Sequence, residues 1–174
     1  MRGHGLTLGP GRARDLDALH ALWLAAVRAT HDFLAPGDLE FYSRLVRREY
    51  LPGAALTVAR DADGAPLGFM GLTTEEGAPP AAPGCAPGCA LCIIDALFVD
   101  PACHRRGVGR ALVAHALAQA GPGGRLLVDV NEQNPGARRF YAALGFVVRG
   151  RSAYDDSGRP YPLLHLEHAP PPAP

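Results

Sequence analysis

The sequence contains no lysine, because all 17 of its basic side chains are arginines. A P-loop needs a lysine in the pattern G-x-x-x-x-G-K-[S/T], so this absence excludes a phosphate site of that class. The acidic residues also number 17, which gives a formal net charge of zero and a pI of about 7.0. Such a chain has no overall basic field, and we therefore expect no nucleic-acid partner.

Long apolar runs are also absent. No stretch approaches the length of a membrane-spanning helix, and the first residues, M-R-G-H-G-L-T-L-G, lack the apolar core and cleavage site of a secretory signal. We therefore expect a cytoplasmic protein without a membrane partner. The 174 residues are enough for one domain over 1–168, followed by a disordered proline-rich tail at 169–174.

Cysteines are few, at positions 85, 89, 92 and 103. The first three have the spacing C-x3-C-x2-C, which is close to that of zinc ligands, but no fourth ligand is nearby. The surrounding segment, 75–90, is rich in proline and glycine and is expected to be an irregular loop insert. We predict unpaired thiols and no metal, with a structural zinc site or a disulfide as the alternatives.

Hydrophobic periodicity predicts an α+β chain. Strands are expected at 3–9, 54–60, 66–74, 91–99, 126–130, 146–151 and 163–168. Helices are expected at 14–30, from Pro36 with Asp38 as cap, at 108–120, and from Asn134-Pro135 to Leu144-Gly145. Strands 91–99 and 126–130 enclose a helix, which predicts a parallel pair joined by a right-handed crossover.

The segment between strand 91–99 and helix 108–120 has the features of an anion site. It reads H-R-R-G-V-G-R from His104 to Arg110. Glycines allow backbone amides to turn toward a ligand, and the N-terminus of the following helix adds unpaired amides and a positive dipole. A dinucleotide fingerprint would need a third glycine where Leu112 stands, so that class is excluded. The alternative is a turn that only connects strand to helix.

The pattern that remains, close to [Q/R]-x-x-G-x-[G/A] after a strand ending in V-D-P, resembles the pyrophosphate loop of the GNAT superfamily of acyl-CoA-dependent N-acyltransferases. His104 departs from the usual Gln or Arg. A second segment, N-P-G-A-R-R-F-Y-A-A-L-G-F from Asn134 to Phe146, is similar to the family pattern N-x-x-A-x-x-x-Y-x-x-x-G-F. Across nearly the whole chain, apart from the insert, the sequence resembles the small bacterial YjaB-like subgroup.

This resemblance implies a GNAT fold: a mostly antiparallel sheet of about seven strands with a splayed parallel pair, flanked by about four helices. It implies acetyl-CoA as co-substrate. The residues at positions that contact the coenzyme in the family are Leu97, Phe98, Val99, His104, Arg105, Arg106, Gly107, Val108, Gly109, Arg110, Asn134 and Tyr141. Asn134 has helix capping as a second role compatible with the first.

The resemblance also implies catalytic roles. Tyr141 matches the general acid that faces the thioester sulfur, with packing in the core as the alternative. An ammonium acceptor must lose a proton before attack, so a base is needed. Asp129 interrupts the apolar strand L-L-V-D-V and is our candidate. The other carboxylates and imidazoles considered are Asp95, Glu132, His31 and Asp32.

His31 and Asp32 lie in the T-H-D-F-L link between the first two helices. The resemblance implies that this link lies on the acceptor side, which makes both residues candidates for substrate binding, against helix capping and packing. We predict an acetyl-CoA-dependent N-acetyltransferase that acts on a primary amine of a small molecule or protein by direct attack in a ternary complex, as a monomer or homodimer. The alternative is a non-catalytic coenzyme-A-binding sensor or interaction module with the same fold.

Overall fold

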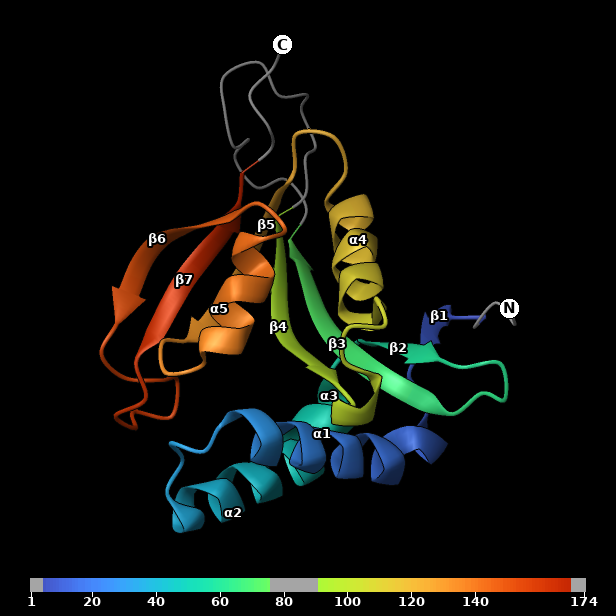
Figure 1. Cartoon of the computed structure of the whole chain (residues 1–174), viewed down its shortest axis with the longest axis horizontal. Coiled ribbons are helices and arrows are strands. Elements are labelled where there is room, and N and C mark those ends of the chain that lie inside the picture. Colours follow the sequence, from blue (N-terminus) through green and yellow to red (C-terminus); the bar gives the residue numbers. More distant parts are fainter. Residues whose placement is uncertain (1–4, 76–90, 170–174) are drawn as a thin grey trace. The chain divides into compact units, whose positions relative to one another are not determined.

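The computed structural model describes residues 5–75 and 91–169. Seven strands form one sheet, in the hydrogen-bonded order β1-β2-β3-β4-β5-β7-β6 (Figure 1). Their bounds are β1 (Thr7–Pro10), β2 (Leu56–Arg60), β3 (Pro66–Glu75), β4 (Leu91–Val99), β5 (Arg125–Asn131), β6 (Phe146–Ser152) and β7 (Leu163–His168). β4 and β5 are parallel, whereas β1–β2, β2–β3, β5–β7 and β6–β7 are antiparallel. The predicted mixed sheet of about seven strands is confirmed.

Four helices have at least eight residues, also as predicted. They are α1 (Leu16–Thr30), α2 (Pro36–Leu45), α4 (Val108–Ala120) and α5 (Pro135–Ala142). A π-helical turn, Val46–Tyr50, joins α2 to the short α3 (Leu51–Gly53). Within the residues that the structure describes, no helix combines the length and apolarity needed to cross a membrane.

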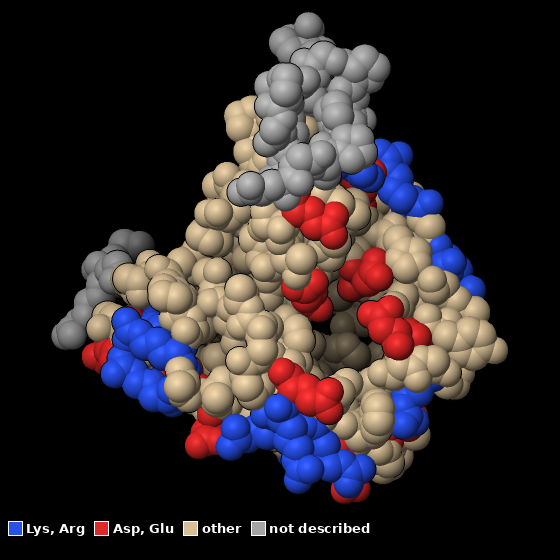
Figure 2. All heavy atoms as spheres, turned by 180° about the vertical axis from the view of Figure 1, so that it is seen from behind, with Lys and Arg blue, Asp and Glu red and all other residues tan. Residues whose placement is uncertain are grey.

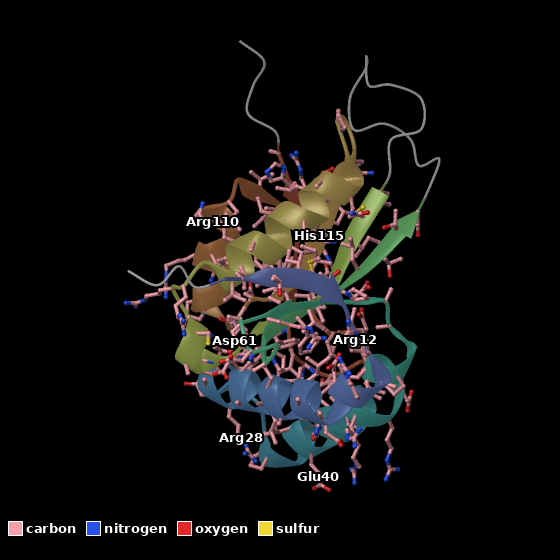
Figure 3. The ribbon with its side chains drawn as sticks, turned by 90° about the vertical axis from the view of Figure 1, so that its right-hand side faces the viewer. Arg12, Arg28, Glu40, Asp61, Arg110 and His115 are labelled. Atoms are coloured by element: carbon pink, nitrogen blue, oxygen red, sulfur yellow. The ribbon has the colours of Figure 1, made fainter. Side chains whose placement is uncertain are left out.

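The chain divides into two compact units, each made of segments that are distant in sequence. Unit 1 comprises Met1–Leu72 and Ala96–His115, and unit 2 comprises Thr73–Asp95 and Ala116–Pro174. The core of unit 1 lies between α1 and the strands. Figures 1 and 3 show α1 and α2 side by side on one side of β2 and β3. The core residues of this cluster are Leu19, Leu22, Trp23, Val27, Leu51, Val58 and Phe69.

Aromatic rings link α1 to the sheet within unit 1. Phe98 lies edge-on to Trp23, with ring centroids 6.2 Å apart, and 5.8 Å from the ring of Phe69. Edge-to-face aromatic pairs add about 0.5–1.5 kcal/mol to the gain from burying their area. These contacts hold the second half of β4 against α1, and the predicted anion loop follows β4 directly.

One ion pair in unit 1 is largely removed from water. Asp15 ends the 3-10 turn (Ala13–Asp15) that precedes α1, and its carboxylate accepts hydrogen bonds from Arg60 Nη2 at 2.7 Å and from the backbone N–H of Arg12 at 2.8 Å. The two side chains of the pair are only 9% and 15% exposed. The hydrogen bond from Arg60 holds the pKa of Asp15 below its usual range. This pair therefore ties the start of α1 to β2.

Unit 2 contains the first half of β4 together with β5, β7 and β6. Residues alternate between its two faces, with Leu126, Val128 and Val130 of β5 buried and Asp129 exposed. Helix α5 packs on β5 and β6, in front of the sheet in Figure 1. The β4–β5 ladder runs from Leu91↔Arg125 to Ile94↔Val128, although β4 continues to Val99 and β5 to Asn131. This early end of the ladder is the pattern that a splayed pair produces.

Several boundaries differ from those predicted. The first strand is shorter than 3–9, and Leu56 rather than residue 54 begins β2. Asp38 does not cap α2: the N-cap is Ala35 and Pro36 occupies the first turn, so the helix begins before Asp38 can act. Asn134 does cap α5, through a 3.0 Å bond from Ala137 N–H to its Oδ1, and Gly145 has the left-handed φ of 86° expected after a helix.

The predicted loop insert lies outside the described residues except for Glu75, which belongs to β3, and so do Cys85, Cys89 and the tail from 170 onward. Cys92 and Cys103 are buried, free thiols. Among the described residues no group of three or more His, Cys, Asp or Glu side chains could hold a metal ion. The alternatives for Cys85 and Cys89 therefore stay open.

The Asp15–Arg60 pair predicts a specific pH dependence of stability. We expect Asp15→Asn to lower the free energy of unfolding by about 2–3 kcal/mol at pH 7, because Arg60 is left without its charged partner. Since folding lowers the pKa of Asp15, its contribution is full above about pH 4 and disappears as the pH falls through the folded value. Denaturant unfolding at pH 7 and pH 3 measures both effects.

Asp17→Asn is the matched control. Asp17 pairs with Arg47, but its side chain is 85% exposed, so its loss should change stability by less than about 0.5 kcal/mol. Equal effects of the two substitutions, or a cost of Asp15→Asn that is the same at both pH values, would contradict the assignment.

Candidate active site

The predicted anion loop is in unit 1, between β4 and α4. Asp100 begins it, and its carboxylate accepts a hydrogen bond from Ala102 N–H at 2.8 Å. Further along, Arg105 and Gly107 take left-handed backbone conformations, with φ of 61° and 84°. Glycine adopts this conformation without strain, and it redirects the chain into α4 at Val108.

The first turn of α4 offers the donors that the sequence predicted. The amides of residues 108–110 lack a partner within the helix. Ala111 N–H is the first that has one, because it donates to Gly107 O at 2.9 Å. Arg105, Arg106 and Arg110 are exposed around this turn, and Figure 3 shows Arg110 at the start of α4. A helix N-terminus with free amides and nearby guanidinium groups is suited to bind phosphate.

Two other predicted residues of this loop have partners within the protein. His104 is exposed, with Nε2 3.3 Å from the carbonyl oxygen of Val99. Val108 is buried, so only its backbone is available to a ligand. The loop therefore presents backbone donors and arginines, while His104 faces back to the end of β4.

The predicted pantetheine-pairing segment, Leu97, Phe98 and Val99, forms the second half of β4 in unit 1. Gly68 of β3 approaches it closely: a Cβ at that position would lie 2.8 Å from Phe98 O and 3.2 Å from a methyl group of Val99. Only glycine fits against this stretch of β4, which fixes its backbone position.

His31 and Asp32 are also in unit 1, after the last turn of α1. Nδ1 of His31 is 2.8 Å from Thr30 Oγ1, and the imidazole lies 5.3 Å from the ring of Phe33. Burial lowers the pKa of His31, so the ring is neutral at pH 7. Asp32 is exposed. These contacts agree with the packing role considered for His31, and substrate binding by either residue stays a prediction.

Asn134 and Tyr141 lie at the two ends of α5 in unit 2. The 3.0 Å bond of the Asn134 cap occupies its Oδ1. Tyr141 is buried between Phe140 and Phe146, in edge-on contacts with centroids 5.0 and 5.1 Å away. Phe140 is more exposed than Tyr141, as expected of consecutive residues on a helix. Burial raises the pKa of Tyr141 well above 10, so the phenol remains a proton donor at physiological pH.

Asp129 and Asp95 lie next to each other in register where the β4–β5 ladder ends. Each follows the last paired residues, Ile94 and Val128, and each is exposed on the same face of unit 2. The carboxylate of Asp95 accepts a 2.8 Å bond from Thr73 Oγ1. Figure 2 shows several acidic side chains on the face of the molecule opposite α5.

Of the other carboxylates considered as a base, Glu132 is bound by Arg151 through two bonds of 2.9 and 2.7 Å. This pairing lowers the pKa of Glu132, which makes it a poor proton acceptor. Among the described residues, no arginine forms an ion pair with Asp129. Instead, its Oδ1 is 2.7 Å from Nδ1 of His165, a residue that sequence reasoning did not find.

Unit 2 also has an apolar groove of about 400 Å³ beside α5. Its lining residues are Pro135, Arg138, Arg139, Ala142, Phe146, Val148, Leu164 and Leu166. None of the predicted site residues lines this groove, although Phe146, which does line it, contacts the ring of Tyr141.

Comparison with known proteins agrees with the motifs. Residues 16–146 match the acetyltransferase (GNAT) family model. The chain belongs to the GNAT family of acetyltransferases. It is 43% identical to the peptidyl-lysine N-acetyltransferase YjaB of Salmonella typhimurium, over 89% of this chain and 92% of that protein. It is similar to the solution structure of apo YjaB from Escherichia coli, with a TM-score of 0.77 and 40% identity over 94% and 97% of the two chains.

A more distant structure shares the fold. It is the PaiA N-acetyltransferase of Thermoplasma acidophilum in complex with coenzyme A, with a TM-score of 0.68 and 16% identity over 94% and 98% of the two chains. As a member of the family, the chain is an acetyltransferase that uses acetyl-CoA as its co-substrate and an amine as its acceptor. The prediction that the chain is an enzyme is confirmed, and the alternative of a non-catalytic sensor is not supported.

The geometry of the α4 turn predicts the effect of a carboxylate placed there. We expect Gly109→Glu to weaken acetyl-CoA binding by about tenfold or more in calorimetry, because the new side chain occupies the turn and repels phosphate. The melting temperature should be unchanged or higher, since an acidic residue in the first turn stabilises a helix.

Ala114→Glu is the control for added charge, because Ala114 is an exposed residue further along α4. It should leave acetyl-CoA affinity within about twofold of the parent, since the charge lies beyond the first turn. If Gly109→Glu bound acetyl-CoA as tightly as the parent, the loop would not be the phosphate site.

Proposed function

We propose that the acceptor is the side-chain amine of lysine in a peptide or protein. The observation that carries this proposal is the pair of exposed carboxylates, Asp95 and Asp129, where the β4–β5 ladder ends. A lysine ammonium is attracted to such a pair, because each carboxylate is exposed and acceptor-only. The names of the relatives that match over most of the chain, peptidyl-lysine N-acetyltransferases, support the same class of acceptor.

Deprotonation of that ammonium is the first chemical requirement. At pH 7.5 only about 0.1% of free lysine side chains are neutral. Asp129 serves as the proton acceptor in our proposal, since its carboxylate is 46% exposed and its Oδ2 has no hydrogen-bond partner among the described residues. Glu132 is excluded from this role by its pairing with Arg151.

Departure of the coenzyme thiolate is the second requirement. The neutral amine attacks the thioester carbonyl, and the C–S bond breaks. From ammonium to amide, the acceptor nitrogen loses two protons. One proton converts the leaving thiolate to a thiol, and the other reaches solvent. Tyr141 is the proposed donor to the sulfur. Its phenol stays protonated because burial raises its pKa, so it donates a hydrogen bond throughout the working pH range.

The remaining predicted residues bind the coenzyme in this proposal. The amides of Gly107–Arg110 and the arginines around them hold the pyrophosphate, and the backbone of Leu97–Val99 pairs with the pantetheine amides. Asn134 Oδ1 is occupied by the cap, which leaves its side-chain NH2 group to donate to the coenzyme. The two roles of Asn134 are therefore compatible.

The role of Tyr141 predicts a selective loss of turnover. We expect Tyr141→Phe to lower kcat by about 100-fold, the scale of general acid catalysis, when acetylation of a lysine peptide is followed by release of free thiol. The KM for acetyl-CoA and the melting temperature should change little, because phenylalanine retains the ring contacts with Phe140 and Phe146.

Tyr154→Phe is the control, since Tyr154 is 60% exposed and also lies in unit 2. It should leave kcat unchanged. If Tyr141→Phe retained at least half of the parental kcat, Tyr141 would be a core aromatic and another group would protonate the thiolate.

A further inference from the structure

Asp129 is one end of a chain of two short hydrogen bonds across unit 2. Its Oδ1 lies 2.7 Å from Nδ1 of His165, and Nε2 of the same imidazole lies 2.7 Å from Oγ of Ser152. The three residues come from neighbouring strands, β5, β7 and β6. Both nitrogens of the imidazole therefore have a partner, and the ring is held in one orientation.

The partners also determine the protonation of the ring. A carboxylate only accepts hydrogen bonds, so Nδ1 of His165 carries a proton and donates to Asp129. In the neutral imidazole Nε2 is then the acceptor, and the hydroxyl of Ser152 donates to it. This arrangement leaves Oδ2 of Asp129 available and fixes the plane of its carboxylate.

The strand register builds this arrangement. Asp129 is directly opposite His165 in the β5–β7 ladder, and Gly150 is opposite His165 in the β6–β7 ladder. A Cβ on Gly150 would lie 3.3 Å from Cδ2 of His165, so a glycine gives the ring its room. The register shifts at a bulge between Val148 and Gly150, and such bulges re-aim nearby side chains.

The other charges on these strands are already paired. Glu167, two residues from His165 on β7, is bound by Arg125 of β5 at 2.7 Å and by Arg149 of β6 at 3.2 Å. The hydrogen bond from Arg125 lowers the pKa of Glu167, which stays ionised and neutralised by the two arginines. Asp129 is thus the unneutralised charge that His165 faces.

We propose that His165 is a positioning residue for the reaction: its Nδ1–H holds Asp129 with Oδ2 directed at the acceptor ammonium, and Ser152 maintains the required tautomer. This inference rests on the proposed role of Asp129 as proton acceptor. In the working form Asp129 is a carboxylate that accepts the Nδ1–H of His165. The ammonium then transfers one proton to Oδ2, and no proton moves along the Nδ1–H bond.

Loss of the imidazole removes the hydrogen bond that holds Oδ1 of Asp129. The carboxylate is then free to turn away from the acceptor. An asparagine at this position keeps an N–H donor near Asp129.

The test compares kcat/KM at pH 8 for the parent, His165→Asn and His165→Ala, with a lysine peptide and saturating acetyl-CoA. We expect His165→Ala to lose about tenfold at pH 8, less than the roughly 10²–10⁴-fold cost of losing a general base. His165→Asn should stay within about threefold of the parent at pH 8, because its side-chain N–H can still hold Asp129. Acetyl-CoA affinity should be unchanged in both variants.

His168→Asn is the matched control, because His168 lies on the same strand and contacts the ring of Phe146 instead of Asp129. It should keep the parental kcat/KM. Parental kcat/KM values for both His165 variants would overturn the positioning role, as would equal losses in His165→Ala and His165→Asn.

Asp129→Asn separates this inference from the proposed function. If Asp129→Asn is inactive while both His165 variants behave as the parent, Asp129 is the base and His165 has no part in the reaction. If Asp129→Asn is fully active, the proposed base is wrong and the inference falls with it.

Discussion

The pairing of β5 with two different neighbours is the constraint on which the candidate site depends. On one side β5 pairs with β4 only as far as Val128, and on the other side it continues to pair with β7 through Asn131. Asp129 is therefore the first residue of β5 past the end of the parallel ladder. Its side chain is exposed while its backbone stays paired with β7. A strand without the second neighbour would not keep a carboxylate in a fixed position there.

The same pairing explains why the two faces of unit 2 differ. Alternation along β5 and β7 places apolar side chains under α5 and places Asp129 and His165 on the other face. The buried face provides the apolar surroundings that keep Tyr141 protonated. The exposed face carries the carboxylates and the imidazole to which we assign the handling of a cationic amine. In our proposal the acid therefore lies in apolar surroundings and the base is exposed to water.

The parts of the structure that local chemistry determines were predictable from the sequence. The bounds of β4 and α4 match the prediction at both ends, because each has a clear periodicity and is bordered by glycine or proline. The Asn134 cap was also found, since a cap and the proline after it are neighbours in sequence. The prediction that Asp38 caps α2 was wrong for a related reason. Proline and aspartate are both common in the first turn of a helix, and here Pro36 already begins it, so the N-cap is Ala35.

The contacts that depend on register were not predictable. His165 and Asp129 are 36 residues apart, and their bond requires both the β5–β7 register and the bulge in β6. The Asp15–Arg60 pair depends in the same way on how α1 meets β2. In the sequence, His165 is one of two histidines in the final strand, and no motif marks it. These contacts depend on which strands pair and in which register, and neither can be deduced from a single sequence.

The absence of lysine from the sequence makes the central claim unusually direct to test. When the protein is incubated with acetyl-CoA and a lysine-containing peptide, every acetyl-lysine found by tandem mass spectrometry must come from the peptide. Our account predicts one acetyl group on the lysine side chain, formed together with free coenzyme A thiol, and none on the same peptide with arginine in place of lysine. Acetylation of small amines together with no modification of any lysine peptide in a varied panel would contradict it.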